Sequence, residues 1–414
     1  MATVLAYTSP ALGNLYPIAA LLDEMRRRGH RVVLRTLASG VSTGQAAGFD
    51  AAPIDPRIEA VQMTDWTART GLGAIKRAFD VFAERAALEV HDVRAALDAI
   101  APDVVVLDCN CWGAPAAVEA AGLPWATFWA YPPYLTSRSS PPFGPGLLPR
   151  SGMFGRLRDG VVGAITRGIT ERAMLGPINR IHGGLGLAPV RSGDDFVLRA
   201  PLVLVGTAEP FEYAHPDWDE HVAMIGPCEF RPSVGAATEL LAIDDRPVVL
   251  VTNSSERQGD DALPITALAA LADEAVHVVA TFPCGVPDGL AIPANATVRR
   301  VVDHGALLDR AVCAITHGGM GVTQKALARG VPVCVVPYGR DQFEVAARVV
   351  FSGSGTRLTP RRLTASRLRS AVAEAMTMSD GAARVAAGFA AAGGVTRGAD
   401  LLERRLLDIA GAGA

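Results

Sequence analysis

The chain contains 414 residues, of which half are hydrophobic and a fifth are charged. This balance excludes a chain that is disordered throughout, because disorder requires low hydrophobicity with high net charge, and the length predicts two or three domains. The formal net charge of −3 excludes the basic footprint of a nucleic-acid-binding protein, and no apolar run approaches the ~18 residues that a membrane span requires.

The first 36 residues alternate between strand and helix patterns. Residues 3–8 read as a short apolar strand, and residues 9–14 read as a loop rich in helix breakers. Residues 17–28 read as a helix that opens on proline, and residues 31–36 read as a second strand. A strand, a helix and a strand over this length predict a βαβ unit and therefore a parallel sheet.

The same pattern returns further along the chain. Residues 103–108 predict a buried strand, 114–121 a helix and 124–129 another strand. Residues 60–100, between the two units, read as long helices. Residues 131–160 are rich in Pro, Ser and Gly, which is typical of a long functional loop or lid.

The second half of the chain repeats this alternation after an irregular stretch. Residues 202–205 predict a strand, whereas residues 209–245 lose periodicity and carry four prolines, which indicates a linker. We predict two α/β domains of similar size, with ligands bound beyond the carboxyl ends of the strands. The predicted later strands are 247–252, 276–281, 297–302, 312–316 and 331–336. The predicted boundaries are 1–208 for the N-terminal domain, 209–240 for the linker, 241–390 for the C-terminal domain and 391–414 for a last helical segment.

The most informative motif follows the strand at 312–316. His317 is followed by three glycines in four positions, Gly318, Gly319 and Gly321, and then by a helical pattern. Glycines let backbone N–H groups approach a phosphate, and the start of a helix adds a partial positive charge. Taken alone, the motif is equally consistent with a tight turn between a strand and a helix.

The residues downstream decide between these interpretations. Gly330, Val331 and Pro332 open the next strand, and the pair Asp341 and Gln342 follows its carboxyl end, where it is well placed to bind hydroxyl groups. His-Gly-Gly-x-Gly, Gly-Val-Pro and Asp-Gln in this order resemble the donor signature of the family 1 nucleotide-sugar-dependent glycosyltransferases. The similarity is strongest to bacterial enzymes that glycosylate macrolides and polyketides. It covers most of the chain and implies the GT-B fold, in which two Rossmann-like domains face each other across a cleft and a C-terminal helix crosses back.

The resemblance implies a site that binds a nucleotide-sugar co-substrate and a hydrophobic small-molecule acceptor. Asp108 matches an acidic position of the N-terminal domain, and four aromatic residues near it are candidates for an acceptor pocket, with core packing an equal alternative for each. These aromatic residues are Trp112, Trp129, Tyr131 and Tyr134. The implied donor-binding residues are Ser254, Ser255, Val302, His304, His317, Gly318, Gly319, Gly321, Val322, Asp341 and Gln342.

Position 14 departs from the family pattern. Members usually have a histidine there, which takes the proton from the acceptor hydroxyl while an acidic residue orients it. Asn14 can hydrogen-bond to an acceptor, but it cannot take up its proton. Three interpretations stay open: Asn14 is an engineered substitution in an ordinary enzyme, Asp108 is itself the base, or the protein is a homologue with little activity that serves as an auxiliary partner.

Position 325 is a second departure. Many relatives have a glutamate there that binds the ribose hydroxyls, and Lys325 cannot accept those hydrogen bonds. A deoxyribose lacks one of these hydroxyls, so this departure favours a TDP-sugar over a UDP-sugar. In the alternative interpretation Lys325 points elsewhere and carries no information about the donor.

The sequence therefore predicts an inverting glycosyltransferase of natural-product biosynthesis. Two alternative functions stay open: a non-catalytic nucleotide-sugar-binding homologue and a sugar-nucleotide epimerase of the same fold. We expect no metal or cofactor, because the few scattered cysteines lack the spacing of a zinc site and amides with His317 would replace a cation. With no recognisable secretion signal, we expect a cytoplasmic monomer or homodimer without stable membrane insertion.

Overall fold

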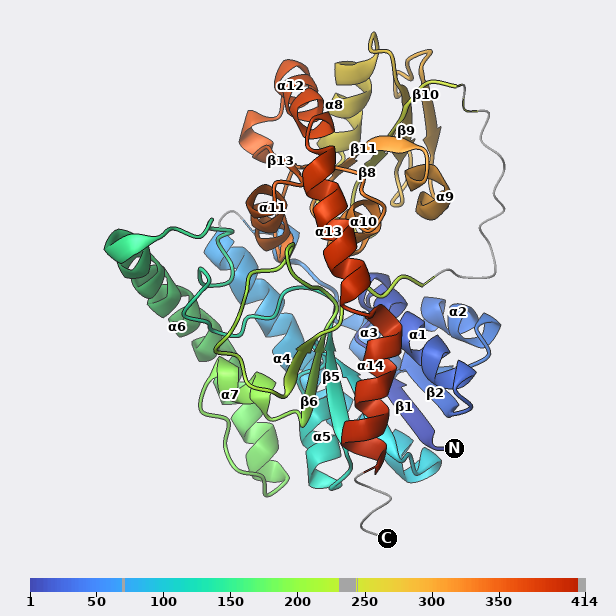
Figure 1. The fold of residues 1–414 in the computed structure, drawn as a ribbon. Helices are drawn as coiled ribbons and strands as arrows, with labels where there is room; N and C mark the ends of the chain where they lie inside the picture. Colours follow the sequence, from blue (N-terminus) through green and yellow to red (C-terminus); the bar gives the residue numbers. More distant parts are fainter. Residues whose placement is uncertain (69–70, 231–242, 244, 409–414) are drawn as a thin grey trace.

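Two parallel β-sheets, one from each half of the chain, form the framework of the protein (Figure 1). They are described in a computed structural model that covers residues 1–68, 71–230, 243 and 245–408. The N-terminal sheet has seven strands in the order β3-β2-β1-β4-β5-β6-β7. In chain order these are β1 (Thr3–Tyr7), β2 (Arg31–Thr36), β3 (Asp50–Pro53), β4 (Val104–Asp108), β5 (Trp125–Trp129), β6 (Leu202–Val205) and β7 (Val222–Met224).

The C-terminal sheet has six strands in the order β10-β9-β8-β11-β12-β13. Each sheet, counted from its own first strand, begins 3-2-1-4-5-6, so the strand order reverses beside β1 and again beside β8. Ligand crevices form at such reversals in open α/β sheets. The strands are β8 (Val248–Thr252), β9 (His277–Thr281), β10 (Ala296–Arg299), β11 (Ala311–Thr316), β12 (Val333–Val335) and β13 (Gly355–Arg357).

Helices cover both faces of each sheet, because every connection between parallel strands must return over a face. In the N-terminal half they are α1 (Leu12–Arg27), α2 (Val41–Ala46), α3 (Pro56–Ala60), α4 (Gly71–Ile100), α5 (Ala114–Ala120), α6 (Gly152–Gly184) and α7 (Gly193–Leu198). In the C-terminal half they are α8 (Ala262–Leu271), α9 (His304–Leu308), α10 (Met320–Leu327), α11 (Gln342–Phe351), α12 (Ala365–Met376), α13 (Ser379–Ala391) and α14 (Gly394–Leu402). Within the described residues, no helix combines the length and the apolar character needed to cross a bilayer.

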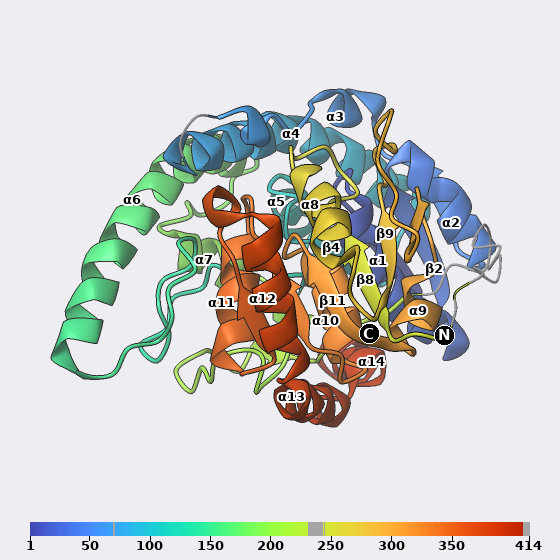
Figure 2. The ribbon, with the colours of Figure 1, turned by 90° about the horizontal axis from the view of Figure 1, so that it is seen from above.

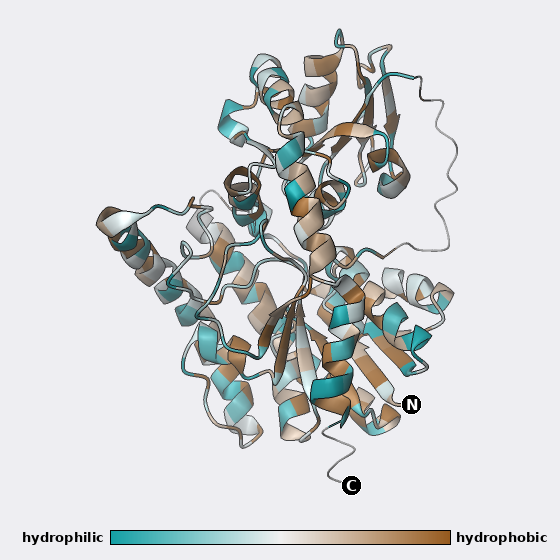
Figure 3. Ribbon diagram, in the orientation of Figure 1, coloured by the Kyte–Doolittle hydropathy of each residue, from teal (hydrophilic) through white to brown (hydrophobic). Residues whose placement is uncertain are grey.

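The strands are the most hydrophobic segments of both halves (Figure 3). Every residue of β4, β5, β8 and β9 is buried, as expected for central strands that are covered on both faces. Four clusters of buried apolar side chains result, two packed against each sheet. The polar residues at the strand ends are therefore held on a rigid support.

The predicted linker at 209–240 is only partly a linker. Ala208 and Phe211 belong to the core of the C-terminal half, whereas β7 returns and pairs with β6 as the edge strand of the N-terminal sheet. The prolines around β7 conceal its short apolar pattern, so the prediction missed it. Residues 231–240, the rest of the predicted linker, lie outside the described residues.

Helix α1 begins at Leu12, five residues before Pro17, where we predicted its start. Proline is favoured in the first turn of a helix, which is why the sequence pattern placed the boundary there. Because the helix begins earlier, Gly13 and Asn14 belong to its first turn instead of a loop. Asn14 is thereby fixed just beyond the carboxyl end of β1.

The Pro-rich segment predicted at 131–160 ends earlier than expected, because α6 begins at Gly152. Figures 1 and 2 show α6 projecting from the N-terminal half. The loop before α6 is tied to the other half, since the Glu344 carboxylate accepts hydrogen bonds from the Gly144 and Gly146 amides at 2.8 Å.

The last helix crosses back to the N-terminal half, as predicted. Helix α14 packs along α1 (Figure 1), and Ala399 and Leu402 join the same buried cluster as Leu21. Arg28 adds ion pairs to Asp400 at 2.7 Å and to Glu403. The two halves are therefore joined by the returning helix as well as by the chain between the sheets.

Candidate active site

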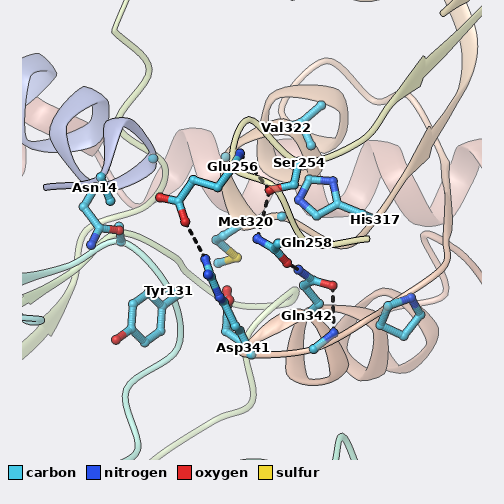
Figure 4. Close-up of a pocket in the computed structure, with 18 of the residues that line it drawn as sticks. Asn14, Tyr131, Ser254, Glu256, Gln258, His317, Met320, Val322, Asp341 and Gln342 are labelled. Carbon is cyan, nitrogen blue, oxygen red and sulfur yellow. Dashed lines mark hydrogen bonds and ion pairs between the residues drawn. The ribbon is translucent and has the colours of Figure 1, made fainter. Parts of the chain in front are cut away.

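A cleft of about 1530 Å³ lies between the two halves and is lined by residues from both. Figure 4 shows Asn14 and Tyr131 of the N-terminal half on one side and Ser254, His317 and Val322 of the C-terminal half on the other. These residues follow β1, β5, β8 and β11, whose carboxyl ends face the cleft. The cleft thus occupies the position that the strand-order reversals predict.

The glycine motif forms the turn from β11 into α10. Gly318 adopts a left-handed φ of +91°, and its amide donates to Thr316 Oγ1 at 3.0 Å. It does not line the cleft, so its role is to shape the turn, and the expectation that its amide holds phosphate is wrong. Gly319 is the N-cap, and Gly321 and Val322 line the cleft in the first helical turn. Amides there lack partners within the helix and form an anion-binding terminus.

His317 stands beside this helix start. Its residue is 8% exposed, and burial lowers the pKa of its imidazole to about 4, so the ring is neutral at pH 7. Its Nδ1 atom has no hydrogen-bond partner among the described residues. A neutral imidazole with an unpartnered nitrogen at a helix N-terminus is suited to donate a hydrogen bond to an anion without adding a buried charge.

The loops after β8 and β12 are hydrogen-bonded to each other. Ser254 Oγ accepts a hydrogen bond from Gln258 Nε2 at 2.9 Å, and Gln258 Oε1 accepts one from Gln342 Nε2 (Figure 4). Gln342 Oε1 in turn accepts from the amides of Tyr338 and Gly339. Gln342 is 2% exposed, and these bonds leave only one of its N–H groups for a ligand.

Asp341 and Ser255 keep more open positions. Both line the cleft, and Ser255 is exposed. Burial raises the pKa of the Asp341 carboxyl to about 6, while the neighbouring Arg340 opposes the shift. Asp341 is therefore ionised at neutral pH and can accept hydrogen bonds from hydroxyl groups.

Of the two residues predicted to border the base, one lines the cleft and the other does not. His304 lines the cleft, and burial together with Lys325 lowers the pKa of its imidazole to about 4. Lys325 also lines the cleft, so it faces the site. Val302 does not; it packs against the C-terminal core instead, which corrects its predicted role as a donor-binding residue.

Arg340 is a cleft residue that the sequence interpretation missed. It has a left-handed φ of +53°, and it pairs with Asp65 of the N-terminal half at 2.9 Å and with Glu256 of the C-terminal half at 2.7 Å. These carboxylates keep the pKa of Arg340 above its ordinary value in spite of burial. Its position beside Asp341 was a signal, but nothing local indicated Asp65 as its partner.

Asn14 and Asp108 meet as the family resemblance implies. Asn14 Nδ2 donates to Asp108 Oδ2 at 3.1 Å, and Asp108 also accepts from the amides of Ser9 and Asn110 and from Ser9 Oγ. Asp108 is 1% exposed and does not line the cleft, whereas Asn14 does. Since the amide nitrogen is turned toward Asp108, the carbonyl oxygen of Asn14 is its free polar atom.

The acceptor-side aromatics fall into two groups. Tyr131 and Tyr134 line the cleft, and Tyr131 Oη donates to Asn110 Oδ1 at 2.7 Å. Trp112 and Trp129 are each 1% exposed and belong to the core, so of the two alternatives left open for them the structure supports core packing. The sequence interpretation missed further aromatic residues of the cleft, among them Trp66, Phe79, Phe82, Phe143 and Phe230.

Comparisons with known proteins agree with this architecture. The family described as "Erythromycin biosynthesis protein CIII-like, C-terminal domain" matches residues 265–397. The 4'-demethylrebeccamycin synthase of Lentzea aerocolonigenes is 34% identical, with 97% of this chain and 99% of that protein covered. The demethyllactenocin mycarosyltransferase of Streptomyces fradiae is 25% identical, with 97% and 86% covered.

Two solved structures share the whole fold. A glycotransferase of kitacinnamycin superposes with a TM-score of 0.74 at 25% identity, covering 98% of this chain and 99% of that one. A calicheamicin glycosyltransferase gives 0.73 at 21% identity, with 99% of both chains covered. The chain therefore belongs to the family 1 nucleotide-sugar-dependent glycosyltransferases of natural-product biosynthesis, which have the GT-B fold.

Proposed function

We propose that the enzyme transfers a sugar, with inversion, from a TDP-sugar to a hydrophobic natural-product acceptor. One observation carries the proposal: His317 and the open helix start at Gly321 and Val322 face Asn14 and Tyr131 across a single cleft (Figure 4). One wall offers groups that bind anions, and the other offers aromatic surface. A donor and an acceptor placed on these walls would meet between them.

The diphosphate would lie at the start of α10. The amides of Gly321 and Val322 and the neutral ring of His317 would donate to its oxygens, with Ser254 and Ser255 approaching from the opposite side. Such preorganised donors stabilise negative charge as it develops on the departing group. We therefore propose that the reaction needs no metal ion or other cofactor.

The sugar would lie between the diphosphate and the acceptor wall. Asp341 would accept hydrogen bonds from its hydroxyls, and the remaining N–H of Gln342 would donate one. An acceptor bound beside Tyr131 approaches the anomeric carbon from the side opposite the diphosphate. A single displacement in that arrangement inverts the configuration of that carbon.

The base would lie near His304 and Lys325. Lys325 faces the cleft at the position from which many relatives bind both ribose hydroxyls with glutamate. An ammonium group cannot accept those bonds, so a donor that lacks the 2′-hydroxyl loses less. This supports TDP over UDP as the nucleotide.

Position 14 also supports a second candidate function. Asn14 occupies the place of the family's proton acceptor, and general-base help is typically worth ~10²–10⁴-fold in rate. The chain could therefore serve as a non-catalytic nucleotide-sugar-binding partner. The aromatic wall argues against an epimerase, because an enzyme that acts on the donor alone has no need of it.

Transfer assays with TDP-glucose and UDP-glucose and an aromatic aglycone test the proposal. We expect a β-glucoside from the α-linked donor, identified by proton NMR, with a higher kcat/KM for the TDP-sugar and no change on adding EDTA. An α-glucoside would overturn inversion, and equal or better use of UDP-glucose would overturn the base preference. Tight binding of nucleotide without transfer to any acceptor would support the auxiliary function.

A further inference from the structure

One face of α4 lines the acceptor side of the cleft. Its lining residues recur at helical spacing and are apolar until the last position, which is an arginine. They are Ala74, Ile75, Ala78, Phe79, Phe82 and Arg85. Among the α4 residues that the structure describes along the cleft, Arg85 alone carries a charge.

Arg85 is 5% exposed, and the hydrogen-bond acceptor that it reaches among the described residues is an uncharged carbonyl. Its Nε donates to the Val61 carbonyl at 3.0 Å, and its Nη2 donates to the same oxygen. Within the described part of the chain, Arg85 forms no ion pair and its Nη1 donates no hydrogen bond. A guanidinium group has five N–H donors, so most of its capacity is unused.

Among the described residues, no carboxylate forms an ion pair with Arg85, although Glu89 and Glu256 lie near it. Burial raises the pKa of Glu89, one turn further along α4, to about 8, so that group is largely protonated at pH 7. Glu256 is nearby but pairs with Arg340, whose own charge lies near Arg85. Within the described ranges, the wall of the acceptor pocket thus holds a buried positive charge without an ion-pair partner.

Among the lining residues that the structure describes, the acceptor side of the cleft also offers no available proton acceptor. Asp108 is engaged by the donors on Ser9, Asn14 and Asn110 and lies behind the wall. The carboxylates that reach the cleft are ion-paired or on the donor side: Asp65 and Glu256 with Arg340, Glu229 with Arg329, and Asp341 beside the sugar position. The cleft histidines, His304 and His317, also belong to the donor half, together with the cation Lys325.

We propose that the acceptor is an acidic aromatic compound, such as a phenol, an enol or an imide N–H, that binds and attacks as its anion, with Arg85 as the counter-ion of that anion. This inference rests on the proposed function and names its acceptor class. Solvent takes the acceptor proton before binding. The electron pair of the acceptor anion forms the bond to the anomeric carbon, and the pair of the broken C–O bond leaves on the nucleoside diphosphate.

The surroundings of Arg85 suit a delocalised anion. Phe79 and Phe82 precede it on the same helix face, and Tyr131, Tyr134 and Phe143 line the same cleft. A flat conjugated acceptor can contact these rings and spread its negative charge across its own framework. Arg85 can then pair with an oxygen far from the nucleophilic atom, and Asn14 need not take up a proton.

The first test is the pH dependence of transfer to acceptors of similar shape and graded acidity. The probes are 2-naphthol, a more acidic nitro-substituted naphthol and 2-naphthalenemethanol, with TDP-glucose as donor. We expect kcat/KM for each naphthol to follow its ionised fraction, with a midpoint at that naphthol's own pKa. The neutral alcohol should react at less than about one-hundredth of the naphthol rate. A single midpoint shared by all acceptors, or equal use of the alcohol, would overturn the inference.

The second test replaces the charge. Arg85→Gln should raise KM for the nitronaphthol at least tenfold and leave the binding of TDP, measured by titration calorimetry, unchanged. Arg85→Lys should recover part of the loss. Arg94→Gln, an exposed change on the same helix, is the matched control and should behave as the parent enzyme.

The outcomes separate this inference from the proposed function. If neither TDP nor UDP binds the parent enzyme, the proposed function fails. If TDP binds and sugar is transferred, but Arg85→Gln leaves KM unchanged while thermal melting confirms folding, the acceptor inference alone fails. If Arg85→Gln does not fold, the folded Arg85→Lys variant decides. A KM for the nitronaphthol that is raised tenfold or more in Arg85→Lys, although the positive charge is kept, would support a role of Arg85 in packing and overturn the inference.

Discussion

The two walls of the cleft use different kinds of groups. The C-terminal wall offers polar atoms fixed by short-range geometry: the amides at the start of α10, the imidazole of His317 and the carboxylate of Asp341. The N-terminal wall offers aromatic faces from α4 and from the segment after β5, with Asn14 and Arg85 as its polar members. The C-terminal wall suits a negatively charged ligand such as a diphosphate. The N-terminal wall suits a flat aromatic ligand, which it would select by shape and by charge.

The walls also differ in how they are held. Arg340 spans from one to the other through Asp65 and Glu256, and Gln324 of α10 donates to the Gly206 carbonyl at 2.7 Å. The relative position of the two walls is therefore set by contacts between the halves as well as by the sheets. Substitutions on each wall, and on the bridge between them, should give separable effects.

The largest loss is expected on the donor wall. His317→Ala removes a preorganised hydrogen-bond donor, and losses of this kind lower kcat by about 10²–10³. Steady-state kinetics with TDP-glucose measures the effect. The exposed His221 provides the control, since His221→Ala should leave kcat unchanged. A loss confined to the KM of the acceptor would contradict the assignment of His317 to the donor wall.

The second prediction concerns the ion pairs of Arg340 with Asp65 and Glu256, which join the two walls. Breaking them should lower both the stability of the protein and its affinity for the donor. Arg340→Gln leaves Asp65, whose side chain is 6% exposed, without its counter-ion, and breaking a buried pair costs about 3 kcal/mol. Urea unfolding should show this decrease together with a raised KM for the donor. Arg31→Gln removes a pair whose side chains are more than half exposed and should change the free energy of unfolding by less than about 0.5 kcal/mol. If both substitutions changed the free energy of unfolding equally, the ion pair of Arg340 with Asp65 would stabilise the protein no more than a surface ion pair.

Ionisation of Asp341 should make the KM for the donor depend on pH. Burial raises the pKa of its carboxyl from 3.8 to about 6, so the ionised form that accepts hydrogen bonds is lost as pH falls through 6. We expect the donor KM to rise several-fold between pH 7 and pH 5, and Asp341→Asn to remove that dependence. Because the folded state binds this proton more tightly than the unfolded state, the contribution of Asp341 to stability falls as pH rises from 4 to 6. A donor KM that stays flat over this range would contradict the role of Asp341.

The smallest effect is expected from a hydroxyl on the acceptor wall. Tyr131→Phe removes the 2.7 Å hydrogen bond to Asn110 but keeps the ring that faces the cleft. Since a hydrogen bond is worth about 0.5–1.5 kcal/mol net, the acceptor KM should rise by about 2–10-fold while the donor KM stays constant. The reverse pattern would mean that Tyr131 serves the donor.

The sequence predicted which residues line the C-terminal wall better than which line the N-terminal wall, for a physical reason. His317 and the glycines form a contiguous motif in which backbone conformation positions the binding atoms, so spacing alone is informative. Arg340 lies inside the same signature, but its partner Asp65 is 275 residues away and no local pattern indicates the pair. Val302 and Gly318 belong to the right segments, yet Val302 packs against the C-terminal core and Gly318 shapes the turn.

The acceptor wall is assembled from distant segments. The helical pattern of residues 60–100 predicts helical structure, but not that Phe79, Phe82 and Arg85 line a cleft. Proximity to Asp108 left the pocket and the core as equal alternatives for Trp112 and Trp129, and both rings belong to the core. The fold itself followed from strand and helix alternation, and errors occurred at boundaries such as the start of α1.

The central claim is that donor binding resides in the C-terminal wall, while position 14 affects only the fate of the acceptor proton. Asn14→His, assayed with TDP-glucose and the neutral 2-naphthalenemethanol, tests it most directly when the Kd for TDP is measured on the same samples. We predict a rise in transfer rate of about 10²-fold or more with an unchanged Kd, because histidine beside Asp108 restores a general base. An unchanged rate, or a shift in the Kd for TDP, would contradict this division of roles.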